Sequence, residues 1–233
     1  MAHLILVRHG QSTYNQQNRF TGGFDAPLTS HGKEQAAYAG QICRDIRINH
    51  CHCSALSRAQ ETRDIFLSQL AQPSGMLASS MSSSDLNERD YGDLTGLNKK
   101  DAAESFGADQ VLQWRRGFTH SPPNGESLQD TKVRVVNYYE NHIRPQMRQD
   151  QNVLVVAHGN SLRALIGHLL HFNAEQFASI EIAWCTPWEL SHRTSTIDHL
   201  TLRKNPLVEG RNQIPSSNSA VSVDRAMLPS HIA

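Results

Sequence analysis

The 233-residue chain is predicted to fold as an α/β protein, a three-layer α/β/α sandwich built on a mostly parallel sheet. Two short apolar runs, residues 4–7 and 153–157, have the length and composition of buried strands. Each run leads into the same dipeptide, His-Gly, at His9 and at His158. The segments between them carry apolar residues at helical spacing. Strands that alternate with helices favour a parallel sheet covered on both faces.

Helical periodicity predicts four helices. Thr29 or Ser30 can cap the first and Ser57 the second, because short hydroxyl side chains accept hydrogen bonds from the free N–H groups of a first turn. The third is expected over residues 126–147, and the fourth after Asn160. The apolar stripes of the four helices are Ala39, Ile42, Cys43 and Ile46; Thr62, Ile65, Phe66 and Leu70; Leu128, Thr131, Val135 and Tyr138; and Leu162, Leu165, Ile166 and Leu169.

Two late strands are predicted over residues 188–191 and 197–202, and the composition changes after about Arg203. The following stretch is rich in serine, asparagine and proline and has few large apolar residues. We therefore expect one catalytic domain over residues 1–203 and a C-terminal tail over residues 204–233 that is mobile or loosely docked.

Charge and hydropathy exclude several classes of protein. The 22 Lys and Arg residues balance the 22 Asp and Glu residues, so no bulk attraction to nucleic acid or to an anionic membrane is expected. No apolar run approaches the roughly 18 residues that span a bilayer. The run after Met1 is too short for a signal peptide and follows no basic stretch. We expect a cytoplasmic protein that binds neither nucleic acid nor membrane.

The four cysteines are expected to be free thiols. One run, His50-Cys51-His52-Cys53, could suggest a metal site. If the run is a strand, its side chains alternate between two faces. The two that share a face are too few to close a zinc site. The structural interpretation is favoured, and no metal is expected.

His9 and His158 are the first candidates for chemistry. Both follow predicted strands, and ligands of open α/β sheets bind outside the carboxyl ends of the strands. Gly10 and Gly159 would let a ligand approach the backbone closely. Either histidine alone could be an ordinary polar residue where a strand meets a loop. The matched pair favours one shared site, with Arg8 beside His9 and Arg163 in the helix after His158.

A histidine in such a site can act as a nucleophile toward phosphorus. A neutral imidazole, with a pKa near 6.5, is available at neutral pH. Its attack on a phosphoryl group gives a phosphohistidine and splits the transfer into two steps. The phosphate is an anion, so the site needs fixed positive charge. Arg8 and Arg58 are candidates because arginine makes planar, bidentate contacts with phosphate oxygens. His158 could donate a further hydrogen bond.

The leaving alkoxide needs a general acid. The acidic run over residues 85–93 supplies candidate carboxylates, and Glu88 is preferred. Spacing alone does not select Glu88 over Asp85, Asp90 or Asp93. Composition alone would make the acidic run a solvated loop. A second basic segment, residues 114–118, is equally consistent with the cationic end of a helix and with a clamp for a substrate carboxylate.

The whole set resembles the histidine phosphatase superfamily, which has Arg-His-Gly after its first strand. It is more similar to the short form of the cofactor-dependent phosphoglycerate mutases, and the similarity reaches about residue 190. The run over residues 86–99 and the Trp114-Arg115-Arg116 segment are specific to the mutases. The matching stretches are residues 6–12, 15, 18–22, 54–59, 86–99, 113–118 and 157–164.

The resemblance implies a phosphoglycerate mutase-like fold and a glycolytic and gluconeogenic isomerase that interconverts 2-phosphoglycerate and 3-phosphoglycerate. It implies that 2,3-bisphosphoglycerate primes the histidine and that no metal is used. The implied catalytic residues are His9, Glu88, His158, Arg8 and Arg58. The implied substrate-binding residues are Ser12, Asn15, Thr21, Gly22, Arg89, Tyr91, Lys99, Arg115, Arg116, Gly159 and Asn160.

Several positions depart from the family pattern. Gly23 stands where the family usually has tryptophan, and Gln11 where it often has glutamate. Residues 184–187 read Trp-Cys-Thr-Pro where the family usually has Thr-Gly-Val-Pro. These changes and the unmatched tail motivate an alternative function, a phosphatase acting on a small phosphorylated metabolite. A non-catalytic protein that binds a phosphorylated ligand is a third alternative, although every residue that the chemistry needs is present. A homodimer is compatible with the sequence, because dimer surfaces need no motif.

Overall fold

The computed structural model describes residues 2–71, 77–193, 196–208 and 222–224. Its described strands form one seven-stranded sheet in the order β3-β2-β4-β1-β5-β6-β7. The strands are β1 (Ala2–Arg8), β2 (His50–Ser54), β3 (Ser79–Ser83), β4 (Val153–Ala157), β5 (Trp188–Arg193), β6 (Thr196–Leu202) and β7 (Ser222–Asp224). Strand β5 is antiparallel to both its neighbours, and the remaining pairs are parallel. The predicted mostly parallel sheet is confirmed.

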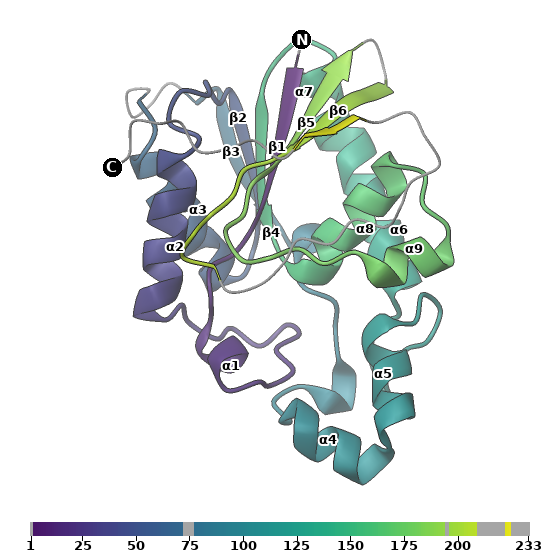
Figure 1. The fold of residues 1–233 in the computed structure, drawn as a ribbon. Helices are drawn as coiled ribbons and strands as arrows, with labels where there is room; N and C mark the ends of the chain where they lie inside the picture. The colour runs from purple at the N-terminus through teal and green to yellow at the C-terminus, as the bar shows by residue number, and fades with distance from the viewer. Residues whose placement is uncertain (1, 72–76, 194–195, 209–221, 225–233) are drawn as a thin grey trace.

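Helices cover both faces of the sheet, as Figure 1 shows. On one face lie α2 (Ser30–Gln41) and α3 (Ser57–Ser68). On the other lie α6 (Leu128–Tyr138), the π turn η3 (Tyr139–Ile143), α7 (Arg144–Met147), α8 (Gly159–Leu169) and α9 (Ala174–Ser179). Below the sheet in that view lie α1 (Thr13–Gln16), α4 (Lys99–Phe106) and α5 (Ala108–Arg116). The short 3₁₀ turns η1 (Ser84–Leu86) and η2 (Gly92–Leu94) lead into this part.

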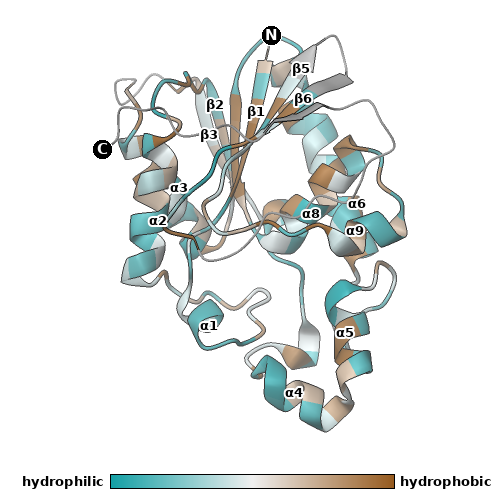
Figure 2. Cartoon of the chain, viewed as in Figure 1, coloured by the Kyte–Doolittle hydropathy of each residue, from teal (hydrophilic) through white to brown (hydrophobic). Residues whose placement is uncertain are grey.

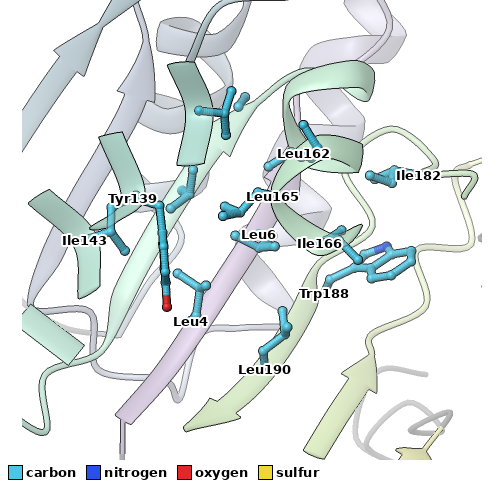
Figure 3. Packing of buried hydrophobic residues seen from close by; sticks show 14 of the residues in the cluster. Leu4, Leu6, Tyr139, Ile143, Leu162, Leu165, Ile166, Ile182, Trp188 and Leu190 are labelled. Carbon is cyan, nitrogen blue, oxygen red and sulfur yellow. The ribbon is translucent and has the colours of Figure 1, made fainter. Parts of the chain in front are cut away.

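The alternation of side chains along β1 divides the core in two. Leu4 and Leu6 pack with α8, while Ile5 and Val7 pack with α2 and α3. Figure 3 shows Leu6 beside Leu165 of α8 and Leu4 beside Tyr139 on the same side of the sheet. Hydrophobic residues accordingly concentrate on the central strands in Figure 2. Both faces of the strand are buried, which explains why its sequence is continuously apolar.

Of the two predicted helix caps, one is confirmed and one is wrong. Thr29 caps α2, because its side chain accepts a hydrogen bond from the Gly32 N–H. Ser57 is wrong as a cap: it is the first residue of α3, and Leu56 precedes it without a capping side chain. The Asp25 carboxylate takes over this role from another loop by accepting hydrogen bonds from the Ser57 N–H and hydroxyl, both at 2.8 Å.

The predicted helix over residues 126–147 forms as one helical run that starts later and is not α-helical throughout. Ser127 caps α6 through a reciprocal pair of hydrogen bonds with Asp130. The π turn η3 then widens the run before α7, which carries a proline in its first turn.

The run His50-Cys51-His52-Cys53 is part of β2, and its side chains alternate between the two faces of the sheet as predicted. Cys51 and Cys53 lie in the core on the α2/α3 side. The His52 ring lies on the other side, with Nδ1 2.9 Å from the Tyr138 hydroxyl and Nε2 2.9 Å from the Gln146 side-chain oxygen. Within the described ranges, no group of three or more His, Cys, Asp or Glu side chains could hold a metal ion.

No helix in the described part of the chain has the length and apolarity required to cross a membrane.

The start of the predicted tail packs on the domain. Asn205 is buried, and its side-chain amide donates hydrogen bonds to the carbonyls of Gln35 and Cys185. The Gln35 side chain in turn donates to the Leu207 carbonyl. Residues 209–221 and 225–233 lie outside the described residues, so the expected tail over residues 204–233 stays a prediction.

The contact between α2 and α3 generates a test of this packing. A Cβ added to Gly40 of α2 would lie 2.4 Å from the Phe66 carbonyl oxygen of α3. Gly40→Ala should therefore lower the free energy of unfolding by roughly 1–3 kcal/mol, as overpacking does. The helix propensity of alanine, worth about 1 kcal/mol, offsets only part of this loss.

The measurement is the urea midpoint at an unchanged m value. Gly23→Ala is the control, because a Cβ there meets no atom within 4 Å. Equal midpoints for the two variants would contradict the close contact.

Candidate functional site

The pairing of β1 with β4 brings His9 and His158 together. The strands are parallel, and their last residues, Arg8 and Ala157, stand opposite each other. The His9 N–H continues the ladder by donating to the Ala157 carbonyl at 3.0 Å. The two imidazole rings lie with their centroids 4.9 Å apart, and both residues are buried. Histidines 149 positions apart in the sequence thus share one site at the carboxyl edge of the sheet.

The protonation of His9 is set by its neighbours. Its Nδ1 lies 2.6 Å from the Gly10 carbonyl oxygen. Because a carbonyl only accepts, Nδ1 carries the hydrogen and Nε2 carries the lone pair. Burial lowers the pKa of His9 well below its ordinary value, and the charges of Arg58 and Arg8 lower it further. His9 is therefore neutral at physiological pH and presents a nucleophilic nitrogen.

Arg8 and Arg58 supply positive charge beside the two rings. Arg8 donates to the Ile182 carbonyl at 2.8 Å and lies over the Trp184 ring, 5.3 Å from its centroid. Arg58, fully buried in α3, donates to the carbonyls of Gly22 and Phe24. Burial lowers the pKa of Arg58 to about 10, which still leaves it charged at neutral pH. Both guanidiniums are held by neutral carbonyls, so their charge remains available to an anion.

His158 is held by two residues that the sequence did not single out. Its Nε2 lies 2.7 Å from the Ser54 hydroxyl, which donates its hydrogen to the Asn87 side-chain oxygen at 2.7 Å. That oxygen also accepts from the Ala55 N–H, which fixes its orientation. The hydroxyl hydrogen is thereby committed to Asn87, so Nε2 of His158 must be the donor to Ser54. Burial, with nearby positive charge, lowers the pKa of His158 well below its ordinary value. A neutral His158 therefore donates from Nε2 to Ser54, and its buried Nδ1 has no hydrogen-bond partner among the described residues.

Glu88 is the carboxylate that reaches this site. Its Oε1 accepts hydrogen bonds from the backbone N–H groups of Arg89 and Asn160, at 2.8 and 3.1 Å. Its Oε2 lies 3.7 Å from the position that a Cβ would take on Gly159, and Arg8 Cζ lies 3.5 Å from the same position. Asp85, Asp90 and Asp93 are instead bonded to loop groups, as the hydrogen bonds from Ser83, Gly92 and Asn124 show. Geometry separates the four acids where spacing could not.

A second group of cations lies beyond Glu88. Arg89 is fully buried, lies over the Tyr91 ring at 4.7 Å, and donates through Nη2 to the Arg115 carbonyl. Its Nε and Nη1 find no acceptor among the described residues. The Tyr91 hydroxyl accepts from the Asn160 side chain. Burial raises the pKa of Tyr91, but the charge of Arg89 and the hydrogen bonds from Arg89 and Asn160 together lower it, and the net shift is downward.

Lys99, Arg115 and Arg116 complete this second group. Lys99 begins α4, and burial lowers its pKa. Arg115 and Arg116 lie in the last turn of α5. Arg116 forms an ion pair with Glu181. The two arginines end a helix, as one interpretation of residues 114–118 expects, and the Arg115 carbonyl accepts a hydrogen bond from the buried Arg89. The clamp for a substrate carboxylate stays a prediction.

The remaining predicted residues, Ser12, Asn15, Thr21 and Gly22, lie in the segment that follows β1. Ser12 and Asn15 form reciprocal hydrogen bonds that cap α1. Thr21 and Gly22 are buried. A Cβ on Gly22 would lie 3.3 Å from the Tyr91 N–H nitrogen. Gly10 has a different purpose from the expected one, since a Cβ there would lie 2.2 Å from the Gly32 carbonyl oxygen. It allows the loop to pack on α2.

Several residues at the site carried only weak signals in the sequence. Ser54 ends β2 at the same edge as His9, so strand logic alone could have found it. Asn87 precedes Glu88 in the acidic run. Thr62 accepts from the Gly10 N–H, and Arg163 donates to the Asn160 side-chain oxygen. Trp184 contacts Arg8 through a ring face, which no spacing rule predicts.

One departure from the family pattern acquires a structural meaning. Cys185 donates its N–H to the Arg8 carbonyl and has φ +45°, a conformation that favours glycine. It occupies the position at which glycine is usual. The chain therefore keeps the same backbone turn at Cys185, although a residue with a side chain is strained in this left-handed conformation.

Comparisons with known proteins agree with this geometry. Residues 4–203 match the family model of the histidine phosphatase superfamily (branch 1). The 2,3-bisphosphoglycerate-dependent phosphoglycerate mutase of Cytophaga hutchinsonii is 42% identical over 208 residues, which cover 88% of this chain and 96% of that protein. The enzyme of the same name from Bartonella bacilliformis is 49% identical over 186 residues, which cover 79% of this chain and 89% of that protein.

A solved structure shares the fold. The α-ribazole phosphatase of Shigella flexneri superposes with a TM-score of 0.72 at 27% identity, covering 91% of this chain and 100% of that one. Fold, buried histidine pair and sequence similarity agree, and the chain belongs to the histidine phosphatase superfamily (branch 1).

Proposed function

We propose that this chain interconverts 2-phosphoglycerate and 3-phosphoglycerate through a phosphoryl group carried on His9. The observation that carries the proposal is the orientation of His9: its Nδ1 is bonded to the Gly10 carbonyl, which leaves the Nε2 lone pair for attack. Relatives that are 42% and 49% identical and are named phosphoglycerate mutases support this choice of reaction.

In the first half of the reaction, His9 Nε2 attacks the phosphorus atom and the bond from phosphorus to the substrate oxygen breaks. Arg8 and Arg58 stabilise the charge that spreads over the phosphoryl oxygens. Because both arginines are already held by carbonyls, little reorganisation is needed when the anion arrives.

Glu88 carries the proton in both directions. Its Oε1 is committed to two backbone N–H groups, so the transferable proton belongs on Oε2. The protonated acid gives this proton to the leaving alkoxide. When the phosphoryl group passes from His9 to the free hydroxyl of a phosphoglycerate, the Glu88 carboxylate takes the proton of that hydroxyl.

The second cation group suits a substrate carboxylate. Arg89 has two unpartnered buried nitrogens among the described residues, and Arg115, Arg116 and Lys99 stand near it. An anion there would satisfy donors that are costly to leave unpaired. A bisphosphoglycerate has two phosphates and a carboxylate, which fit two cation groups; when bound, 2,3-bisphosphoglycerate supplies the phosphoryl group that primes His9.

A phosphatase acting on a small phosphorylated metabolite is the second candidate. The open space at Gly23, where the family usually has tryptophan, favours it, because the mutase reaction must exclude water from the phosphohistidine. The two functions share the first half-reaction and differ in the acceptor.

The deciding experiment measures isomerisation and phosphate release together, on 3-phosphoglycerate with and without 2,3-bisphosphoglycerate. We expect isomerisation that the bisphosphate stimulates and that His9→Ala abolishes. A folded enzyme that releases phosphate without isomerising the substrate would instead be a phosphatase. His31→Ala, on the exposed first turn of α2, is the control variant.

The low pKa of His9 predicts a specific NMR titration. Its ring should stay neutral as the pH falls through 6.5 and should show the Nδ1–H tautomer in ¹⁵N spectra, with His9→Asn identifying the signal. The unfolded chain binds this proton near pH 6.5 and the folded chain does not, so His9 makes the protein less stable as the pH falls below that value. Protonation at or above pH 6.5 would exclude the proposed ground state.

Arg116→Gln tests the carboxylate subsite. Loss of a hydrogen bond to a charged group costs about 1.5–3 kcal/mol, which corresponds to roughly a 10- to 150-fold rise in KM for phosphoglycerates. Hydrolysis of glycerol 2-phosphate, which has no carboxylate, should change little. An equal effect on both substrates would place Arg116 at the phosphoryl group or in the general stability of the site.

A further inference from the structure

Arg134 of α6 makes an unusual set of contacts with the loop that carries Glu88. Its Nη1 donates to the carbonyls of Asp85 and Asn87 at 2.7 and 3.0 Å. Its Nη2 donates to the Glu88 carbonyl at 3.2 Å. One guanidinium therefore holds three backbone carbonyls of residues 85–88.

Glu126 completes this arrangement from the start of α6. Its two carboxylate oxygens accept from Nε and Nη2 of Arg134 at 2.9 and 2.8 Å. The same carboxylate accepts from the Asp90 N–H at 3.0 Å, and the Glu126 N–H donates to the Asp90 carbonyl at 2.9 Å. Burial alone would raise the pKa of Glu126, but the hydrogen bonds and charge of Arg134 lower it. Residues 85–90 are thus fastened at both ends.

The side chains of Asn87 and Glu88, in the loop held by Arg134 and Glu126, point toward the histidine site. The Asn87 side-chain oxygen accepts a hydrogen bond from the Ser54 hydroxyl, which in turn is hydrogen-bonded to His158. Glu88 reaches the N–H of Asn160 at the start of α8. The described contacts of Arg134 are with the loop backbone and Glu126, so it acts on the reaction through the loop.

We propose that Arg134 and Glu126 are positioning residues for proton transfer, which clamp residues 85–90 and hold the Glu88 carboxyl where the leaving alkoxide receives its proton. The inference rests on the proposed role of Glu88. As the phosphorus–oxygen bond breaks and the bond from phosphorus to His9 Nε2 forms, the electron pair left on the alkoxide takes the proton of Glu88 Oε2. A displacement of about 1 Å from such a geometry can cost on the order of 100-fold in rate.

The test compares two leaving groups in the phosphorylation of His9. The leaving group of glycerol 2-phosphate is an alkoxide, which needs a proton from the acid. The leaving group of p-nitrophenyl phosphate is a stable phenolate, which does not. Both are followed by phosphate release, so the comparison remains valid whichever acceptor the phosphoryl group finally meets. Glu88→Gln supplies the reference pattern for a lost acid.

Arg134→Lys keeps the charge but cannot reproduce the fork of hydrogen bonds. We expect kcat/KM for glycerol 2-phosphate to fall by on the order of 100-fold, with little change for p-nitrophenyl phosphate. Glu126→Gln should show a smaller difference of the same kind between the two substrates, because glutamine keeps the shape of the side chain and loses its charge. Arg144→Lys is the matched control, since Arg144 pairs with Glu140 elsewhere on the same helical run and should leave both reactions unchanged.

Equal losses on both substrates in Arg134→Lys and Glu126→Gln would overturn the proposal, because they indicate a general structural role. Unchanged rates in these variants, beside a clear split in Glu88→Gln, would overturn the clamp while leaving the acid in place. If Glu88→Gln itself shows no split, the proposed role of Glu88 fails and the clamp loses its purpose.

Discussion

The site depends on the in-register parallel pairing of β1 with β4. That pairing brings the ends of two strands from opposite halves of the sequence side by side, and it continues by one hydrogen bond into His9. A slip of one residue would turn the apolar side chains of β1 toward the wrong helices. The same packing that makes the core therefore fixes the distance between the two imidazoles. Rigid strand ends are precise supports for groups that must meet one phosphorus atom.

The second constraint is the burial of positive charge without full neutralisation. Arg58 and Arg89 are fully buried, and the hydrogen bonds described for them go to carbonyls. Burying charge in this way costs stability. It is tolerable because carbonyl dipoles and Glu88 lie close, and it gives an anion-binding site that needs little rearrangement. The same positive field, added to burial, keeps both histidines neutral.

Much of this architecture could be predicted from local patterns. The strands around His9 and His158, the helices of both layers and the alternation of β2 follow from periodicity, because each depends on residues close in sequence. Ser57 failed as a cap because its partner, Asp25, comes from a distant loop. Among the four acids of the loop, only tertiary contacts of Glu88 with α8 distinguish it. The Ser54–Asn87–His158 chain and the Arg134 clamp depend on segments that sequence spacing does not relate.

The central claim is that His9 passes its phosphoryl group to a phosphoglycerate and not to water. The most direct measurement is a chase of isolated, radiolabelled phosphoenzyme with unlabelled 3-phosphoglycerate. The account predicts that the label leaves His9 as 2,3-bisphosphoglycerate and appears in 2-phosphoglycerate on further turnover. Label recovered only as inorganic phosphate, at a rate that 3-phosphoglycerate does not change, would contradict it.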